Sequence, residues 1–332
     1  MIRPIEKIYH PVWRQLAGGQ AGFEGWYYRL VSADHLHSLA LIPGFQRGEK
    51  EEGFLQILMQ GWERGMWLSY PMEEMAFTDR PFEVRAGKNI FSLKNIHLSV
   101  DSPRRIRGQV QIKNARTYPV TLISPGIMGW YRYVPKMECY HAVVMMDAEL
   151  DGEIQIQGQS IDFTGGRLYV EKDWGASFPS AWIWVQSNQF KQTGTSFMLS
   201  LADIPWRNSS FEGFIAYLQT PEKLYRFTTY TGAKIVHWEE DSKAIHLTLE
   251  DRKYRLSIRI IRSGGGELRA PQNGSMNRIL KETIAGKVDL WLEKRNGERI
   301  VSCTGDPAGF EQAGIFKSRE VRGGSLSDEE TK

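Results

Sequence analysis

The stretch DFTGGRLYVEKDWGASFPSAWIWVQSNQF, residues 162–190, carries the pattern that decides the fold. Two of its segments, RLYVEKDWG (167–175) and AWIWVQSN (181–188), alternate in side-chain type as β-strands do. In the second segment Ile183 and Val185 share one face. The opposite face carries Trp182, Trp184 and Gln186. Two largely apolar faces fit a barrel wall covered outside and lined by an apolar lumen, and equally fit a strand buried between two sheets.

Period-two patterns recur on both sides of this stretch. They occur in GFLQILMQG (53–61), KNIFSLKNIHLSV (88–100), RIRGQVQIKNA (105–115), GEIQIQGQSIDF (152–163), KAIHLTLED (243–251), KYRLSIRII (253–261), KVDLWLEK (287–294) and RIVSCTG (299–305). Many short strands separated by polar or glycine turns predict an all-β sandwich or barrel with little helix. The one helix that we expect is AGFEQAGIFKSRE (308–320).

Two segments share an order of elements, which suggests a duplicated β unit. Both 25–44 and 183–205 contain an aromatic strand, a short polar turn and an apolar strand that ends near a proline. We therefore predict two β domains with a boundary near residues 140–155. The predicted domains are an N-terminal one at 1–145 and a C-terminal one at 146–322, followed by a polar tail at 323–332.

The composition narrows the class of protein. The 332 residues carry a net charge of +3, and the basic residues are scattered, without the basic stripe that nucleic-acid binding requires. Neither an apolar leader nor an apolar run long enough to span a bilayer is present, and the two cysteines form no disulfide framework. A cytoplasmic protein is expected. Aromatic residues at 12% fit either a ring-lined ligand cavity or an aromatic-rich β core.

Three side chains of the first segment could carry acid chemistry. A strand over 167–175 would place Tyr169, Glu171 and Asp173 on one face, with the two carboxyls about 7 Å apart. Like charges in an aromatic cavity raise at least one pKa, and a neutral carboxylic acid is a proton donor. The alternative is that Lys172 or a distant arginine pairs with one carboxylate and braces the turn at Gly175.

Aromatic residues gather in two further stretches. SPGIMGWYRYVPKMECYH (124–141) is broken by prolines and glycines, so we expect a loop across a barrel mouth that presents Trp130 and Tyr133. GFEGWYYR (22–29) sets Glu24 beside Trp26 and Tyr28, which suits a binding wall or an edge strand with a solvated carboxylate. Metal-ligand spacing, phosphate loops and nucleophile motifs are absent from the sequence, so it calls for no metal.

Three stretches together resemble the tocopherol cyclase family: GFEGWYYR, SPGIMGWYRYVPKMECYHAVV and the opening stretch. The resemblance is dense over about 22–45 and 124–190 and thinner beyond. It implies the fold of the lipocalin-like superfamily that contains carotenoid 1,2-hydratases and some Diels–Alderases. In that fold two β-barrel-like halves hold a ligand site in or between them.

The resemblance also implies a reaction. Tocopherol cyclases close a chromanol ring without a cofactor: a proton is delivered to a prenyl alkene, and the quinol hydroxyl attacks the tertiary cation. The parts required are a neutral acid, aromatic faces and a dry pocket. The implied partner is a hydrophobic prenyl-lipid substrate, with transient peripheral contact with a membrane. A non-catalytic lipid carrier, or a hydratase or pericyclic enzyme acting on another isoprenoid or polyene, remains open.

By this resemblance the site residues receive expected roles. Hydratase-type relatives use a Tyr-x-Asp pair with an upstream His-x-Trp pair; Tyr169-x-Glu171 fits the first, while Val143 replaces the tryptophan after His141. We expect Glu171 as proton donor with Asp173 second, and Tyr169 and His141 to orient it or to hold the phenolic oxygen. The expected substrate-binding residues are Glu24, Trp26, Tyr28, Trp130, Tyr133, Trp174, Trp182, Trp184 and Gln186.

Overall fold

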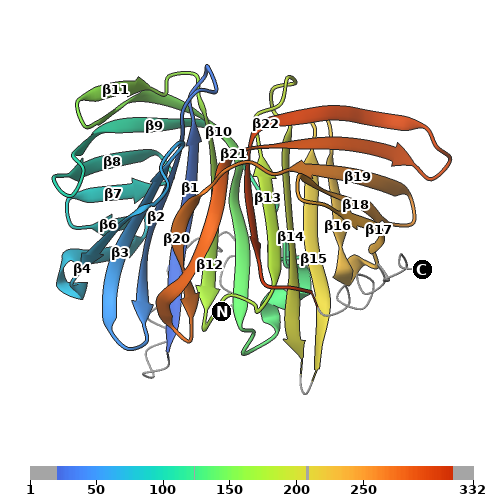
Figure 1. Cartoon of the computed structure of the whole chain (residues 1–332), viewed down its shortest axis with the longest axis horizontal. Coiled ribbons are helices and arrows are strands. Elements are labelled where there is room, and N and C mark those ends of the chain that lie inside the picture. Colours follow the sequence, from blue (N-terminus) through green and yellow to red (C-terminus); the bar gives the residue numbers. More distant parts are fainter. Residues whose placement is uncertain (1–20, 123, 207–208, 317–332) are drawn as a thin grey trace, which may run out of the picture.

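The computed structural model describes residues 21–122, 124–206 and 209–316, and within them it consists of two antiparallel β-sheets side by side (Figure 1). The 12-stranded sheet runs in the order β4-β3-β2-β1-β12-β10-β9-β8-β7-β6-β5, with β11 paired to β10. The 10-stranded sheet runs in the order β16-β15-β14-β13-β22-β21-β19-β18-β17, with β20 paired to β21.

The first sheet is formed by β1 (Gly22–Val31), β2 (Ser38–Arg47), β3 (Glu51–Met59), β4 (Met66–Tyr70), β5 (Met75–Asp79), β6 (Phe82–Ala86), β7 (Asn89–Ser92), β8 (Asn95–Val100), β9 (Ile106–Thr117), β10 (Cys139–Ile156), β11 (Gln159–Asp162) and β12 (Arg167–Gly175). The second is formed by β13 (Trp182–Ser187), β14 (Ser196–Trp206), β15 (Ser209–Gln219), β16 (Leu224–Thr228), β17 (Lys234–Glu240), β18 (Ala244–Glu250), β19 (Tyr254–Ile261), β20 (Gly266–Gln272), β21 (Ser275–Lys294) and β22 (Arg299–Ala313). Short 3₁₀ turns are η3 (Met72–Glu74), η4 (Gly129–Tyr133) and η5 (Thr229–Thr231).

This architecture confirms the predicted all-β fold of two packed lipocalin-like halves with little helix. The predicted helix at 308–320 is wrong over its described part, because residues 308–313 belong to β22. Ala308 and Phe310 alternate into the core of the second half, and the pairing of β22 with β13 and β21 fixes this segment in extended form. Residues 317–320 lie outside the described part of the chain.

Three buried apolar clusters organise the molecule. One fills the first half and another fills the second, while a third lies between them and contains side chains from both sheets. Along β13, Ile183 and Val185 enter the core of the second half, whereas Trp182 and Trp184 face the cluster between the halves. The strand is therefore buried on both faces, and its tryptophan face meets the other half.

The chain passes from one sheet to the other between Gly175 and Trp182. The boundary expected at 145/146 falls inside β10, which continues to Ile156 and pairs with β12 in the first sheet. Both β10 and β12 thus stand at the centre of the first half.

A long hairpin ties the halves together. The 20 residues of β21 pair with β22 and β19 in the second half, and with β20 near the hairpin turn. The paired part of β20 and β21 extends over the first half, where it contacts β1, β2 and β3 (Figure 1). The side chain of Gln56 on β3 binds this hairpin through Arg269 of β20. The Gln56 amide nitrogen donates to the Arg269 carbonyl at 2.9 Å, and the Gln56 amide oxygen accepts from the Arg269 N–H at 2.8 Å.

Candidate active site

A cavity of about 220 Å³ lies between the two halves. Strands β1 and β12 form one wall, β13, β14 and β22 form the other, and residues 134–139 after η4 border it. Its lining is largely apolar and aromatic, and polar groups converge at one place, which is the usual character of a small-molecule site. Those polar groups are His141, Glu171, Asp173 and Glu311.

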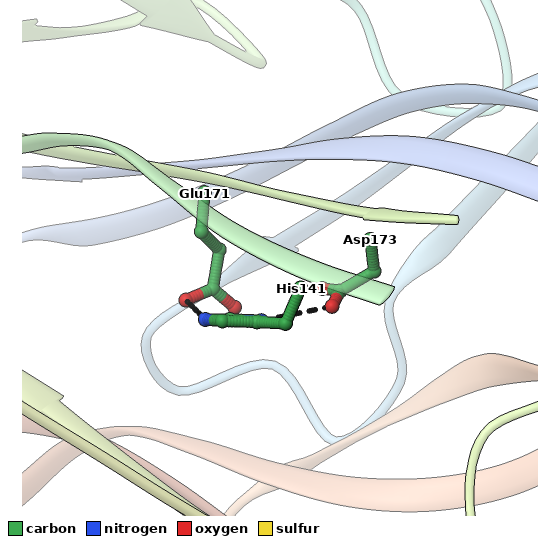
Figure 2. Close-up of side chains that lie close together, drawn as sticks. All are labelled: His141, Glu171 and Asp173. Carbon is green, nitrogen blue, oxygen red and sulfur yellow. Dashed lines mark hydrogen bonds and ion pairs between the residues drawn. The ribbon is translucent and has the colours of Figure 1, made fainter. Parts of the chain in front are cut away.

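The register of β10 and β12 brings the first three of these groups together. His141 is the cross-strand partner of Asp173, and Val143 is that of Glu171, so His141 stands on the same face as both carboxyls. Figure 2 shows the imidazole between the two acids: Nδ1 lies 2.8 Å from Asp173 Oδ1, and Nε2 lies 3.7 Å from Glu171 Oε2. Strand β12 ends at Gly175, two residues after Asp173. A Cβ at Gly175 would collide with the Glu138 carbonyl oxygen.

The Glu171 carboxyl is almost fully buried and accepts two hydrogen bonds on one oxygen. Tyr169 donates its hydroxyl to Oε2 at 2.6 Å, and Trp184 donates its indole N–H to the same atom at 3.0 Å. Burial, with the nearby Asp173, raises the pKa of Glu171 to about 8, although the His141 imidazole opposes this shift. Because both donors use Oε2, the proton of the neutral acid belongs on Oε1.

His141 is held as a cation beside this neutral acid. Burial lowers its pKa, but the carboxyls of Asp173 and Glu171 outweigh burial and raise the pKa to about 9. Its Nδ1 donates to Asp173, whereas its buried Nε2 has no hydrogen-bond partner among the described residues. At neutral pH the cluster is therefore a His141–Asp173 ion pair next to a protonated Glu171.

Within the described residues, the ion-pair partner of Lys172 is neither Glu171 nor Asp173, as considered for β12, but Glu24. Lys172 points to the opposite face of the strand, where its Nζ lies 2.5 Å from Glu24 Oε1 with both side chains fully buried. Trp26 and Trp174 flank the ammonium, with ring centroids 5.3 and 4.5 Å from Nζ. The carboxyls of Glu171 and Asp173 lie on the other face of β12, where they line the cavity.

The expected binding residues divide into two groups. Trp182 and Trp184 line the cavity. The others lie elsewhere: Trp26 and Tyr28 in the core of the first half, Glu24 against Lys172, Trp174 stacked on Tyr140, Gln186 buried as an acceptor for Arg29, and Trp130 and Tyr133 exposed on the loop beside the cavity. Tyr169 is buried behind Glu171 and reaches the site through its hydroxyl.

Sequence reasoning chose the wrong face of β1, and on the second wall it found Trp182 and Trp184 but missed Glu311. Tyr27, not Trp26 or Tyr28, lines the cavity, since alternation sends the even-numbered residues into the first core. Sequence reasoning missed Glu311 because this residue lies in 308–320, the segment predicted to be a helix. Reading 308–313 as an alternating strand would have placed Glu311 opposite Phe310, on the face away from the second core.

The same cluster offers a set of metal-ligand atoms. Single donor atoms of His141, Glu171 and Asp173 lie within 4.8 Å of one another. Glu171 Oε2 already accepts from Tyr169 and Trp184, and His141 Nδ1 is bonded to Asp173. This hydrogen bonding fits proton transfer better than a metal.

The fold and the site together define a lipocalin-like protein of two β halves with an acid-bearing aromatic cavity between them. The model of the family described as tocopherol cyclase-like matches residues 98–314, and the chain belongs to this family. A curated relative, "Probable tocopherol cyclase, chloroplastic" from Oryza sativa subsp. japonica, is 27% identical over 228 residues, which cover 63% of this chain and 47% of the relative. The chain thus spans about half the length of that relative.

Solved structures share the fold at low sequence identity. The crystal structure of CghA with Sch210972 has a TM-score of 0.56 at 10% identity, and covers 89% of this chain and 89% of its own. Kievitone hydratase from Nectria haematococca has a TM-score of 0.53 at 10% identity, and covers 95% of this chain and 94% of its own. Within the described residues, no helix is long and apolar enough to cross a membrane.

Proposed function

We propose that this protein is an enzyme that protonates the alkene of a prenylated quinol and closes the ring to a chromanol. The observation that carries the proposal is a buried Glu171 carboxyl that faces an aromatic cavity beside the hydrogen-bonded His141–Asp173 pair. Membership of the tocopherol cyclase-like family supports the reaction type. The reaction transfers neither electrons nor a group from another molecule, so it requires no cofactor.

The first step moves a proton from Glu171 to carbon. The O–H bond of Glu171 breaks, and the alkene π electrons form a C–H bond at the less substituted carbon. The carboxylate that results is stabilised by the Tyr169 hydroxyl, by the Trp184 N–H and by the His141 cation 3.7 Å away. Because His141 Nε2 has no acceptor before the proton leaves, its charge stabilises the ionised state more than the resting state.

The second step closes the ring. The tertiary cation would lie among Tyr27, Trp182 and Trp184, whose ring faces stabilise positive charge. A quinol hydroxyl held nearby then attacks the cation, forming the C–O bond and losing its proton. The apolar lining reduces the water available for competing capture.

Other outcomes of the same protonation are distinguishable. Capture of the cation by water would give a tertiary alcohol, and the fold is shared with kievitone hydratase. A pericyclic reaction on a polyene, or carriage of a prenyl lipid without conversion, would use the same cavity without a lasting proton transfer.

The direct test is incubation of the purified protein with 2-methyl-6-phytylquinol analogues and with a membrane lipid extract, followed by chromatography and mass spectrometry. Ring closure leaves the mass unchanged and shifts retention, hydration adds one water, and carriage changes neither. Cyclisation of the quinol is the expected result. Tight binding with no conversion at any pH would favour the carrier.

The variant Glu171→Gln tests the proton donor. The amide oxygen of the substituted side chain can still accept from Tyr169 and Trp184, so folding and ligand affinity should stay near wild type, while turnover falls by at least about 10²-fold. Glu239→Gln on the exposed strand β17 is the matched control and should keep wild-type turnover. Full activity in Glu171→Gln would remove this residue from the mechanism.

We also propose that the substrate is taken from a bilayer. Leu122, Trp130 and Tyr133 are 60%, 49% and 61% exposed, and the latter two lie on η4, directly before the segment that borders the cavity. Exposed aromatics of this kind insert at a membrane interface. A cytoplasmic enzyme with transient membrane contact stays a prediction.

A further inference from the structure

A second pair of carboxyls stands on the wall opposite Glu171, of which Glu282 is fully buried and Glu311 is partly buried. Glu282 on β21 and Glu311 on β22 are direct cross-strand partners, which brings their side chains to the same face about 5 Å apart at Cβ. Within the described chain, no ion pair joins either of them to a basic side chain. Two adjacent buried carboxyls cannot both be ionised at low cost.

The hydrogen bonds of this pair mirror those of Glu171. Trp182 donates its indole N–H to Glu311 Oε2 at 3.0 Å, as Trp184 does to Glu171, and Tyr27 donates its hydroxyl to Glu282 Oε1. The other oxygen of Glu282 is buried without a partner among the described residues. Each of the two cavity carboxyls therefore receives an indole N–H from β13.

The geometry puts Glu311 within reach of the same ligand as Glu171. Glu311 lines the cavity and is the cross-strand partner of Trp184, the residue whose indole holds Glu171. Gly309 on the same strand makes room for this indole, since a Cβ there would lie 2.9 Å from the Trp184 ring. A ligand that fills the space beside Trp184 can thus touch both acids at once.

The pKa shifts of Glu282 and Glu311 suit Glu311 to the role of proton acceptor. Burial and then the neighbouring Glu311 raise the pKa of Glu282 well above its ordinary value, so Glu282 stays neutral. Burial also raises the pKa of Glu311, to about 7, so this carboxyl ionises first. The fully buried Arg29, whose guanidinium donates to Gln186 and to the Ile284 carbonyl, supplies a compensating positive charge nearby.

We propose that Glu311 is a second catalytic group, which accepts the proton of the hydroxyl that attacks the cation, with Glu282 and Tyr27 as positioning residues. The inference rests on the proposed function and deepens it. It gives the proposed quinol substrate an orientation, with its attacking hydroxyl at Glu311 and its alkene at Glu171.

The proton count balances over one turnover. Glu171 loses a proton to the alkene carbon, the hydroxyl oxygen forms the C–O bond, and its O–H bond breaks as Glu311 gains the proton. The substrate is isomerised without net gain or loss of atoms. After the product leaves, Glu311 releases a proton and Glu171 takes one from water.

The test separates the two proton transfers by running the reaction in D₂O. Wild-type protein with 2-methyl-6-phytylquinol should give the ring-closed product carrying one deuterium on carbon. In Glu311→Gln we expect ring closure to fall by about 10²-fold or more, while the recovered open-chain quinol gains deuterium. That deuterium arises because the cation, no longer trapped, returns a proton to Glu171 and reforms an alkene.

Each other outcome overturns the proposal in a different way. Wild-type ring closure in a folded Glu311→Gln would show that Glu311 accepts no proton. Loss of both closure and deuterium uptake would place Glu311 in the first step rather than the second. Absence of both reactions in the wild-type protein would instead overturn the proposed function on which this inference rests.

Two further variants serve as a matched control and as a substitute for Glu311→Gln. Glu298→Gln, in the exposed turn before β22, should behave as wild type in both readouts. If Glu311→Gln does not fold by circular dichroism, Glu311→Asp takes its place. That variant keeps a carboxylate one methylene further from the ligand, and it should close the ring more slowly than wild type while taking up deuterium; a wild-type rate would contradict the proposal.

Discussion

At the scale of single residues, the surroundings of the buried Glu171 carboxyl favour its protonated form at rest and also stabilise its ionised form. It is protonated because burial disfavours its charge, yet it is surrounded by groups that stabilise the charge once it forms. Of the two members of the His141–Asp173 pair, the imidazole favours the Glu171 charge, whereas the Asp173 carboxyl raises the pKa of Glu171. An acid strong enough to protonate carbon must lose its proton into such prepared surroundings.

The pKa shifts of the site predict how stability depends on pH. The pKa values of Glu171, Glu311 and His141 are all raised in the folded protein. Between pH 4.5 and about 8 the folded chain keeps a proton on Glu171 that the unfolded chain releases, so the free energy of unfolding falls as pH rises. One such proton contributes a slope of about 1.4 kcal/mol per pH unit.

Glu171→Gln removes this titration. We expect its free energy of unfolding to depend less on pH than that of wild type, and to exceed it at about pH 8. Urea denaturation at several pH values measures both slopes, with Glu239→Gln as the control that keeps the wild-type slope. Equal slopes in all three proteins would contradict a protonated Glu171.

At this scale the sequence was sufficient to predict which side chains of β12 share a face, while their catalytic roles stay a prediction. Tyr169, Glu171 and Asp173 follow from alternation along one strand, and His141 was found through family resemblance. Tyr27, Glu282 and Glu311 could not be found in this way. Tyr27 and Glu311 line the cavity, and Glu282 lies beside Glu311, through strand pairings between distant segments. Alternation gives the face of a strand on which each side chain lies, but not which other strand that face meets.

At the scale of elements, β12 is a strand with two separate buried polar clusters, one on each face. The cavity face carries the acids, and the other face carries Lys172 against Glu24 in the first half. Alternation predicted this division of the side chains. It could not tell which face of β1 met the cavity, because Trp26 and Tyr27 are both aromatic and both buried.

The Glu24–Lys172 pair gives a prediction for this element. Lys172→Met removes the ammonium that lies 2.5 Å from the buried Glu24 carboxylate, and we expect it to lower the free energy of unfolding by about 3–5 kcal/mol. Combining it with Glu24→Leu should recover most of that loss, since an apolar pair of similar volume needs no charge partner. Chemical denaturation of the two single variants and the double variant measures the coupling; additive effects would contradict it.

At the scale of the whole molecule, the cavity belongs to neither half alone. The sequence predicted two β halves correctly, and resemblance allowed a site in or between them. The structure places the cavity between them, because the third apolar cluster joins β13 and β14 to β1 and β12. Which faces two sheets turn toward each other depends on their packing, and no single segment encodes that choice.

The exposed aromatics beside the cavity give a prediction for the molecule as a whole. The double variant Trp130→Ser/Tyr133→Ser should reduce co-sedimentation with phosphatidylcholine–phosphatidylglycerol vesicles severalfold, because two interfacial anchors are lost. Leu36→Ser, in the turn at the far end of β1, removes an equally exposed apolar side chain and should leave binding unchanged. Absence of any vesicle-bound wild-type protein would rule out this route of substrate entry.

The hairpin of β20 and β21 has a consequence for how the fold can be divided. It is encoded after the entire first half, yet it lies upon that half and is fastened there through Gln56. A fragment ending at Gly175 would therefore lack the hairpin that covers part of β1, β2 and β3. The complementary fragment would carry this hairpin without the strands that it packs against. The two halves therefore depend on each other. A chimaera that takes one half from a relative would also need the β20–β21 hairpin to match the surface of the first half that it contacts.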